Sequence, residues 1–155
     1  MRSTIAAGLM SLFATAALAG PYGFWALSVA PDGIKAGVIF PDFSPSDFAG
    51  MSLNCVPGTN IVGISVDSAK HLSSGARAKV VISVDGASAD YQGKVELSEM
   101  DDQARVVFQT TLADPILASL SGAAKIGFAI NGNFQELPVN NSKTVVAEFL
   151  KKCQS

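Results

Sequence analysis

The stretch AKVVISVD, at residues 78–85, decides the fold class. Val80, Ile82 and Val84 fall on one side of an extended chain, and the residues between them fall on the other. This alternation is typical of an antiparallel strand that buries one face. Asp85-Gly86 follows directly and favours a turn. The stretch therefore predicts a strand of an antiparallel sheet.

Similar apolar runs, bounded by Gly, Pro, Ser, Asn or Asp, recur along the chain. We expect further strands at residues 24–30, 34–40, 51–56, 60–67, 91–97, 105–111 and 125–130. In the first of these, Trp25, Leu27 and Val29 form the more apolar face. Asn131-Gly132 is the clearest hairpin turn, because both residues tolerate positive φ.

Two short helices are expected beside these strands. Residues 114–120 form the first, since Pro115 suits an opening turn and Gly122 follows the end. Residues 142–152 form the second, with Ser142 as its cap and an apolar stripe that includes Val146 and Phe149. The sequence thus predicts a mainly β fold: an antiparallel β-sandwich or partly open barrel with a short helix and a C-terminal helix.

Residues 1–19 have the features of a secretory signal peptide. Arg2 precedes an apolar run at residues 5–18, and small residues precede a cleavage site between Ala19 and Gly20. The run is shorter than the roughly 20 apolar residues that span a bilayer. We therefore expect a mature domain at residues 20–155 that is periplasmic or secreted and is not embedded in a membrane. An uncleaved N-terminal helix is the alternative.

Cys55 and Cys153 are the only cysteines. An oxidising compartment favours a disulfide between them, and their wide separation excludes the Cys-x-x-Cys pattern of redox catalysts and zinc sites. Two buried free thiols are the alternative. The formal net charge of −2 and the scattered basic residues also give no sign of a nucleic-acid partner.

No catalytic, metal or cofactor motif is evident. His71 is the only histidine, and the serines near it lack a Gly-x-Ser-x-Gly elbow. The acidic cluster Glu96, Glu99, Asp101 and Asp102 lacks the spacing of a calcium loop and is typical of a solvated turn. We expect a protein that is not an enzyme and needs no cofactor. A hydrolase that uses His71 or the acidic cluster is the alternative.

Aromatic residues near the mature N-terminus suggest a contact surface for a partner protein or a sugar. These residues are Tyr22, Phe24, Trp25, Phe43 and Phe48. Packing of the same side chains in the core is the competing interpretation.

Several residues occur in an order that resembles a known family. They are Trp25, Cys55, Val84-Asp85-Gly86, residues 108–120, Ile130-Asn131-Gly132 and residues 149–153. Their order is similar to that of VasI-type proteins associated with bacterial type VI secretion, and more broadly to the invasion-associated locus B group of exported bacterial proteins. The resemblance implies an exported, noncatalytic accessory protein with a β-rich domain, and it assigns no active-site residue.

An exported interaction module that binds a protein is therefore the leading functional hypothesis. A carrier that holds an apolar small molecule inside a barrel is a further alternative, since small barrels can enclose one such ligand. The alternation of inward and outward residues is the same for a filled interior and a hollow one.

Overall fold

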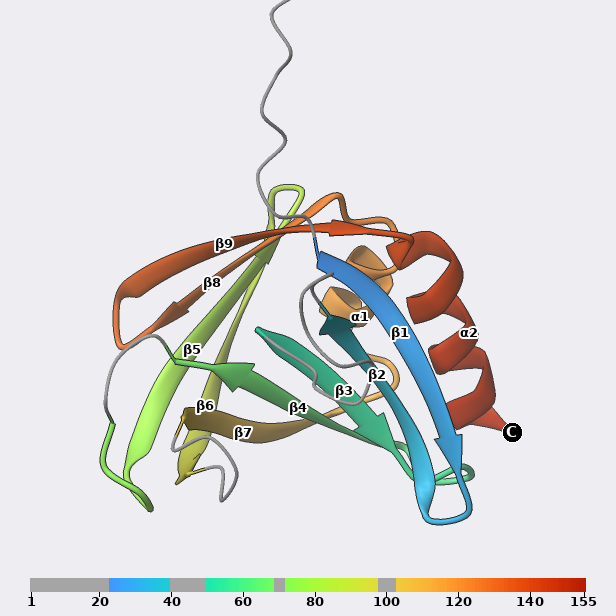
Figure 1. Ribbon diagram of the computed structural model, residues 1–155, viewed down its shortest axis with the longest axis horizontal. Helices are drawn as coiled ribbons and strands as arrows, with labels where there is room; N and C mark the ends of the chain where they lie inside the picture. The colour runs from blue at the N-terminus through green and yellow to red at the C-terminus, as the bar shows by residue number, and fades with distance from the viewer. Residues whose placement is uncertain (1–22, 40–49, 69–71, 98–102) are drawn as a thin grey trace, which may run out of the picture.

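Nine strands and two helices make up the part of the chain that the computed structural model describes, namely residues 23–39, 50–68, 72–97 and 103–155 (Figure 1). The strands are β1 (Gly23–Ala30), β2 (Gly33–Ile39), β3 (Met51–Cys55), β4 (Ile61–Asp67), β5 (Arg77–Val84), β6 (Ala87–Leu97), β7 (Ala104–Thr111), β8 (Lys125–Ile130) and β9 (Asn133–Asn140). The helices are α1 (Pro115–Leu120) and α2 (Ser142–Gln154).

The strands form one closed barrel in the order β1-β2-β3-β4-β7-β6-β5-β8-β9. The first four strands form one meander, and β5, β6 and β7 form another that joins it through β4 and β7. Closure comes from a short parallel pairing in which Gly23 and Phe24 of β1 lie opposite Val139 and Asn140 of β9. The mainly β prediction is confirmed, but the sandwich or partly open barrel is wrong, because these pairings join the strands in a single closed sheet.

Two strands differ from the sequence-based expectation. β6 begins at Ala87, well before residue 91, because Asp85 and Gly86 adopt positive φ (48° and 84°) and form a tight hairpin with β5. β9 has no counterpart among the strands expected from the sequence, although the Asn131-Gly132 turn before it is expected. Polar residues and Pro138 obscure its pattern.

Apolar side chains fill the barrel. The predicted core face of β5, made of Val80, Ile82 and Val84, is buried, and so are the inward residues of the neighbouring strands. Val80, Ile82 and Val84 are each exposed to solvent by no more than 1%. The described interior is therefore packed as a core.

The expected core face of β1 is only partly confirmed. Trp25 is 2% exposed and Leu27 is half-buried, whereas Val29 is 61% exposed. The reason is visible in Figure 1, where β1 runs on into a hairpin with β2 that projects beyond the barrel wall.

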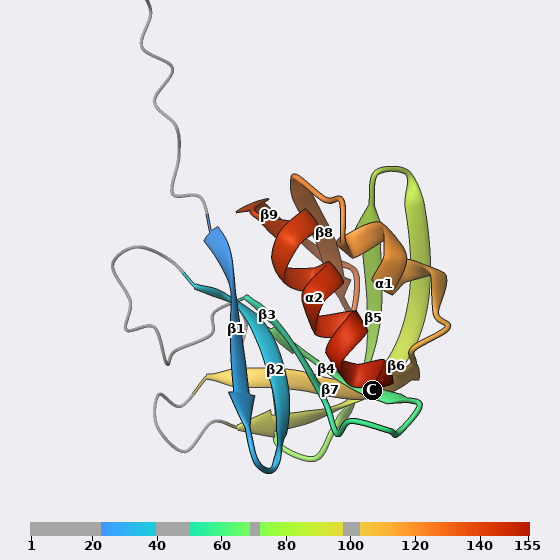
Figure 2. The same cartoon turned by 90° about the vertical axis from the view of Figure 1, so that its right-hand side faces the viewer.

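The two helices lie across one end of the barrel (Figure 2). α2 contacts β1, β2 and α1, and it buries Val146, Phe149 and Cys153. The expected cap Ser142 is wrong: Ser142 is the first residue of the helix, and Asn141, at a φ of 54°, precedes it. The Asn141 side chain makes no capping bond, because it binds the main chain of Trp25 instead.

The predicted disulfide between Cys55 and Cys153 is present, with the two Cα atoms 6.0 Å apart. It joins the end of β3 to the last turn of α2, and both cysteines are buried. The Gly58 N–H donates to the Cys153 carbonyl beside it. The C-terminal helix is thus tied covalently to the wall that it covers.

Candidate interaction surface

Only two residues of the expected aromatic surface lie in the described part of the chain. Phe24 points outward from β1 and is 38% exposed. Trp25 is buried in the core, so its assignment to a contact surface is wrong, because alternate residues of β1 face opposite sides. Tyr22, Phe43 and Phe48 lie outside the described residues, as do Ala19 and Gly20 at the expected cleavage site.

The residues considered for catalysis or metal binding do not form a site in the described ranges. His71, Glu99, Asp101 and Asp102 lie outside them. Glu96 is exposed on β6 and lies opposite Arg105 of β7, whose guanidinium pairs with Asp67 at 3.0 Å. Across residues 23–39, 50–68, 72–97 and 103–155, no group of three or more His, Cys, Asp or Glu residues could hold a metal ion.

A polar cluster that sequence reasoning missed lies around Asp114, the N-cap of α1. Its carboxylate accepts hydrogen bonds from the Tyr91 hydroxyl at 2.8 Å, from the Thr110 hydroxyl, and from the Ile116 N–H at 3.0 Å. Tyr91 also stacks on Phe108, with ring centroids 4.6 Å apart. The cluster therefore fastens α1 to β6 and β7.

Both titrating groups of this cluster are held in their ordinary charge states. Burial raises the pKa of Tyr91, and the hydrogen bond to Asp114 and that carboxylate's charge raise it further. Burial alone would raise the pKa of Asp114, but hydrogen bonds from Thr110, the Ile116 amide and Tyr91 together lower it. With pKa values shifted in these directions, the Tyr91 phenol stays neutral and the Asp114 carboxylate stays ionised near pH 7. Such a pair suits a structural anchor rather than a general acid or base.

Phe134 is the most exposed large apolar side chain in the described part of the chain, at 64%. It points outward from β9, and its ring lies over Gly127 of β8: a Cβ placed on Gly127 would be 2.9 Å from the ring. An aromatic side chain over a cross-strand glycine covers main chain that would otherwise face water. Most of the ring nevertheless remains open to solvent.

The outer side chains around Phe134 are small or apolar. Phe134 lies opposite Ala129 of β8, which lies opposite Val81 of β5, so the three share one row on the outside of the barrel. Two exposed ion pairs flank this row: Lys125 with Glu136 at 3.1 Å, and Lys79 with Asp90 at 2.6 Å. We name these side chains, together with Gly127, the Phe134 surface.

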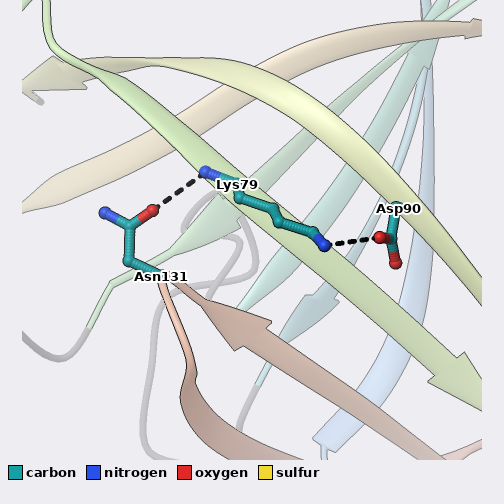
Figure 3. A network of polar contacts seen from close by, with 3 residues as sticks. All are labelled: Lys79, Asp90 and Asn131. Atoms are coloured by element: carbon teal, nitrogen blue, oxygen red, sulfur yellow. Dashed lines mark hydrogen bonds and ion pairs between the residues drawn. The ribbon is translucent and has the colours of Figure 1, made fainter.

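The tip of the β8–β9 hairpin is fixed in place beside this surface (Figure 3). Asn131 has a φ of 48°, and its side-chain oxygen accepts a bond from the Lys79 N–H at 2.9 Å. The Asn131 N–H donates to the Lys79 carbonyl, also at 2.9 Å. The surface thus lies on three strands that are held together up to the hairpin tip.

Sequence reasoning missed Phe134 because the strand that carries it was not recognised. A signal was available: after Asn131-Gly132, Leu137 and Val139 mark an inward face with a period of two. Phe134 has the opposite parity and must therefore point outward. Extending the alternation beyond the hairpin turn would have found it.

No protein-family model matches the chain, and neither a curated protein nor a solved structure matches it. In the ranges that the structure describes, no helix has the length and apolar character needed to cross a membrane. The fold and its surface define the chain as a closed nine-strand β-barrel with a disulfide-tethered helical end.

Proposed function

We propose that this protein is an exported, noncatalytic interaction module that binds a partner protein through the Phe134 surface. The observation that carries the proposal is the 64% exposure of Phe134 on a sheet face where its neighbours in the same row are Ala129 and Val81. A central aromatic surrounded by a polar rim is the arrangement in which a few residues supply most of the binding energy. Lys125, Glu136, Lys79 and Asp90 supply that rim.

Export is supported by two features of different kinds. The N-terminal residues 1–19 have the pattern of a signal peptide. The disulfide between Cys55 and Cys153 favours an oxidising, extracytoplasmic environment, since such bonds rarely persist in a reducing cytosol. The resemblance to VasI-type exported proteins agrees with an accessory role in a bacterial envelope.

The alternatives receive less support. A carrier of apolar molecules needs unfilled interior space, whereas the inward side chains of the described strands are tightly packed. A hydrolase that uses His71 or the acidic cluster needs a nucleophile and a base within hydrogen-bond reach, and of these residues only Glu96 lies in the described part of the chain, where it is exposed on β6. We therefore do not propose either activity.

A photoreactive benzoylphenylalanine at position 134, in cells that produce the protein, tests the binding surface. The matched control carries the same group at Lys35, an exposed residue on the outer face of β2. We expect a discrete crosslinked product at position 134 that the control lacks. Equal labelling at both positions, or no product at either, would contradict the proposed surface.

Export is tested separately by fractionation and N-terminal sequencing of the mature chain. We expect Gly20 as the first residue and a non-reducing gel mobility that shows the disulfide. An intact leader on reduced protein in the cytosol would refute the exported part of the proposal.

A further inference from the structure

The register of the β8–β9 hairpin determines which main-chain groups of β9 face away from the barrel sheet. The Val139 N–H donates to the Ala124 carbonyl at 2.9 Å. In an antiparallel ladder this arrangement repeats every second residue, so Leu137 and Gln135 also bond to β8. The N–H and C=O groups of Phe134 and Glu136 therefore point to the opposite edge.

That opposite edge is paired over only part of its length. β1 meets β9 only at Val139 and Asn140, the C-terminal end of β9, and from there β1 continues toward its hairpin with β2 (Figure 1). Within the described ranges, no strand pairs with the edge of β9 at Phe134 or Glu136. Among the described strands, four main-chain hydrogen-bonding groups thus have no strand partner and lie in a row beside the Phe134 ring.

The edge of β1 that faces β9 does not offer free main-chain groups at Trp25. The Asn141 side chain donates to the Trp25 carbonyl and accepts from the Trp25 N–H, both at 2.9 Å. α2 lies next to the same strand (Figure 2). A helix is one of the ways in which proteins cover a sheet edge, and β9 has no such cover among the described elements.

The side chain that lies inward from the open edge is buried. Leu137 points inward, and a Cβ placed on Gly50 would be 2.9 Å from its side chain. Pro138 follows, and its lack of an N–H limits how far an added ladder could extend toward β1. The open edge is therefore a short binding site on a packed wall.

We propose that this edge binds an extended segment of the partner polypeptide, which adds a strand beside β9. The inference rests on the proposed function and names the form of the partner at that surface. Only another extended main chain supplies donors and acceptors at the spacing of Phe134 and Glu136. Directly opposite residues place their side chains on the same face. The segment therefore carries an apolar residue beside Phe134 and, two positions away, a basic residue that shares the Glu136 carboxylate with Lys125.

The direct test uses purified, disulfide-bonded protein and the probe peptide acetyl-Thr-Lys-Thr-Val-Thr-amide, which in an antiparallel alignment places Val beside Phe134 and Lys beside Glu136. Its Val and Lys share one face, and their N–H groups would face β9. We expect the peptide to shift the backbone amide signals of Phe134 and Glu136 in NMR spectra at millimolar concentration or below. Peptide methylated on the Val and Lys nitrogens should bind at least about tenfold more weakly, whereas methylation of two Thr nitrogens that face away should have little effect. Equal binding of the two methylated forms, or no shift with the unmodified peptide, would overturn the proposal.

A second variant separates failure of this inference from failure of the proposed function. Glu136→Pro removes an edge-facing N–H and leaves the bonds to β8 in place, so the protein should fold and lose the crosslink at position 134. Glu136→Gln, which keeps the N–H, should retain it, and a circular dichroism melt of both variants verifies folding. If folded Glu136→Pro keeps the crosslink, strand addition is refuted while binding at the Phe134 surface stands. If the unaltered protein gives no crosslink, the proposed function itself fails.

Discussion

Asn141 joins two elements through both its backbone and its side chain. Its φ of 54° starts α2 in the required direction, and its amide group binds both main-chain groups of Trp25. One residue thus takes the place of a strand partner for β1 and orients the helix that covers the barrel end.

Replacement of Asn141 should separate these two roles. Asn141→Gly keeps the positive φ but loses two hydrogen bonds, so the free energy of unfolding should fall by about 1–3 kcal/mol. Asn141→Ala should cost roughly 1 kcal/mol more, because a Cβ disfavours the left-handed conformation. Urea unfolding measures both variants. An unchanged midpoint for Asn141→Gly would show that the clamp on Trp25 contributes nothing.

Ser142 offers a test of where the helix cap lies. Its hydroxyl is buried and has no hydrogen-bond partner in the described part of the chain. Ser142→Ala should therefore leave the free energy of unfolding unchanged or raise it by up to about 1 kcal/mol, because an unsatisfied buried group is removed. Loss of a true N-cap would instead lower it by about 1 kcal/mol. Thermal unfolding distinguishes the two signs.

Loss of the Asp114 cap should lower the free energy of unfolding, and the size of this effect should depend on pH. Its folded pKa lies below the ordinary value of 3.8, so its stabilisation is fully present above that value and is lost as the pH falls through the folded pKa. Asp114→Asn should unfold at lower urea concentration than the unaltered protein at pH 7. The difference between them should shrink as the pH is lowered below about 4. A difference that stays constant down to pH 2 would contradict this assignment.

At the scale of elements, α2 depends on the bond at its last turn. Cys55 and Cys153 close a long loop, for which such a bond contributes about 2–4 kcal/mol. Cys153→Ala should lower the free energy of unfolding by about that amount, and Cys55→Ala should have a similar effect. The double variant should be little worse than either single one, since all three lack the same bond. Additive losses measured by urea unfolding would show that each cysteine acts mainly through its own packing.

A strand could be predicted from the sequence where apolar and polar residues alternate regularly. It could not be predicted where the alternation is irregular. Val80, Ile82 and Val84 mark β5 without ambiguity. β9 is hard to recognise because Phe134 lies on its outward side and Gln135 on its inward side, which reverses the apolar alternation, and because Pro138 is unusual within a strand. The Phe134 surface lies partly on β9, so it could not be predicted without first recognising that strand.

For the whole molecule, barrel closure could not be read from local patterns. A sandwich and a closed barrel bury the same alternate residues, and the choice between them depends on β4 meeting β7 and β9 meeting β1. Those pairings involve residues far apart in the sequence, and no pattern within one strand encodes them. The single disulfide, by contrast, followed from there being only two cysteines.

The filled interior can be tested with two neighbouring valines of β7. Val106 points inward and is 0% exposed, whereas Val107 points outward and is half-buried. Val106→Ala should lower the free energy of unfolding by about 2 kcal/mol, because it leaves a cavity in a packed core. Val107→Ala should cost clearly less. Equal, small losses in urea unfolding would indicate a loosely filled or hollow barrel.

The seam between β1 and β9 also constrains when the molecule can fold. The clamp from Asn141 to Trp25 bridges a sequence separation of 116 residues, and the parallel pairing beside it is equally remote. Because a chain is synthesised from its N-terminus, β1 has no neighbour on this side until residues 133–141 have been made. A nascent chain that lacks β9 and α2 therefore cannot close the barrel, and the seam beside β1 stays open until both elements have been synthesised.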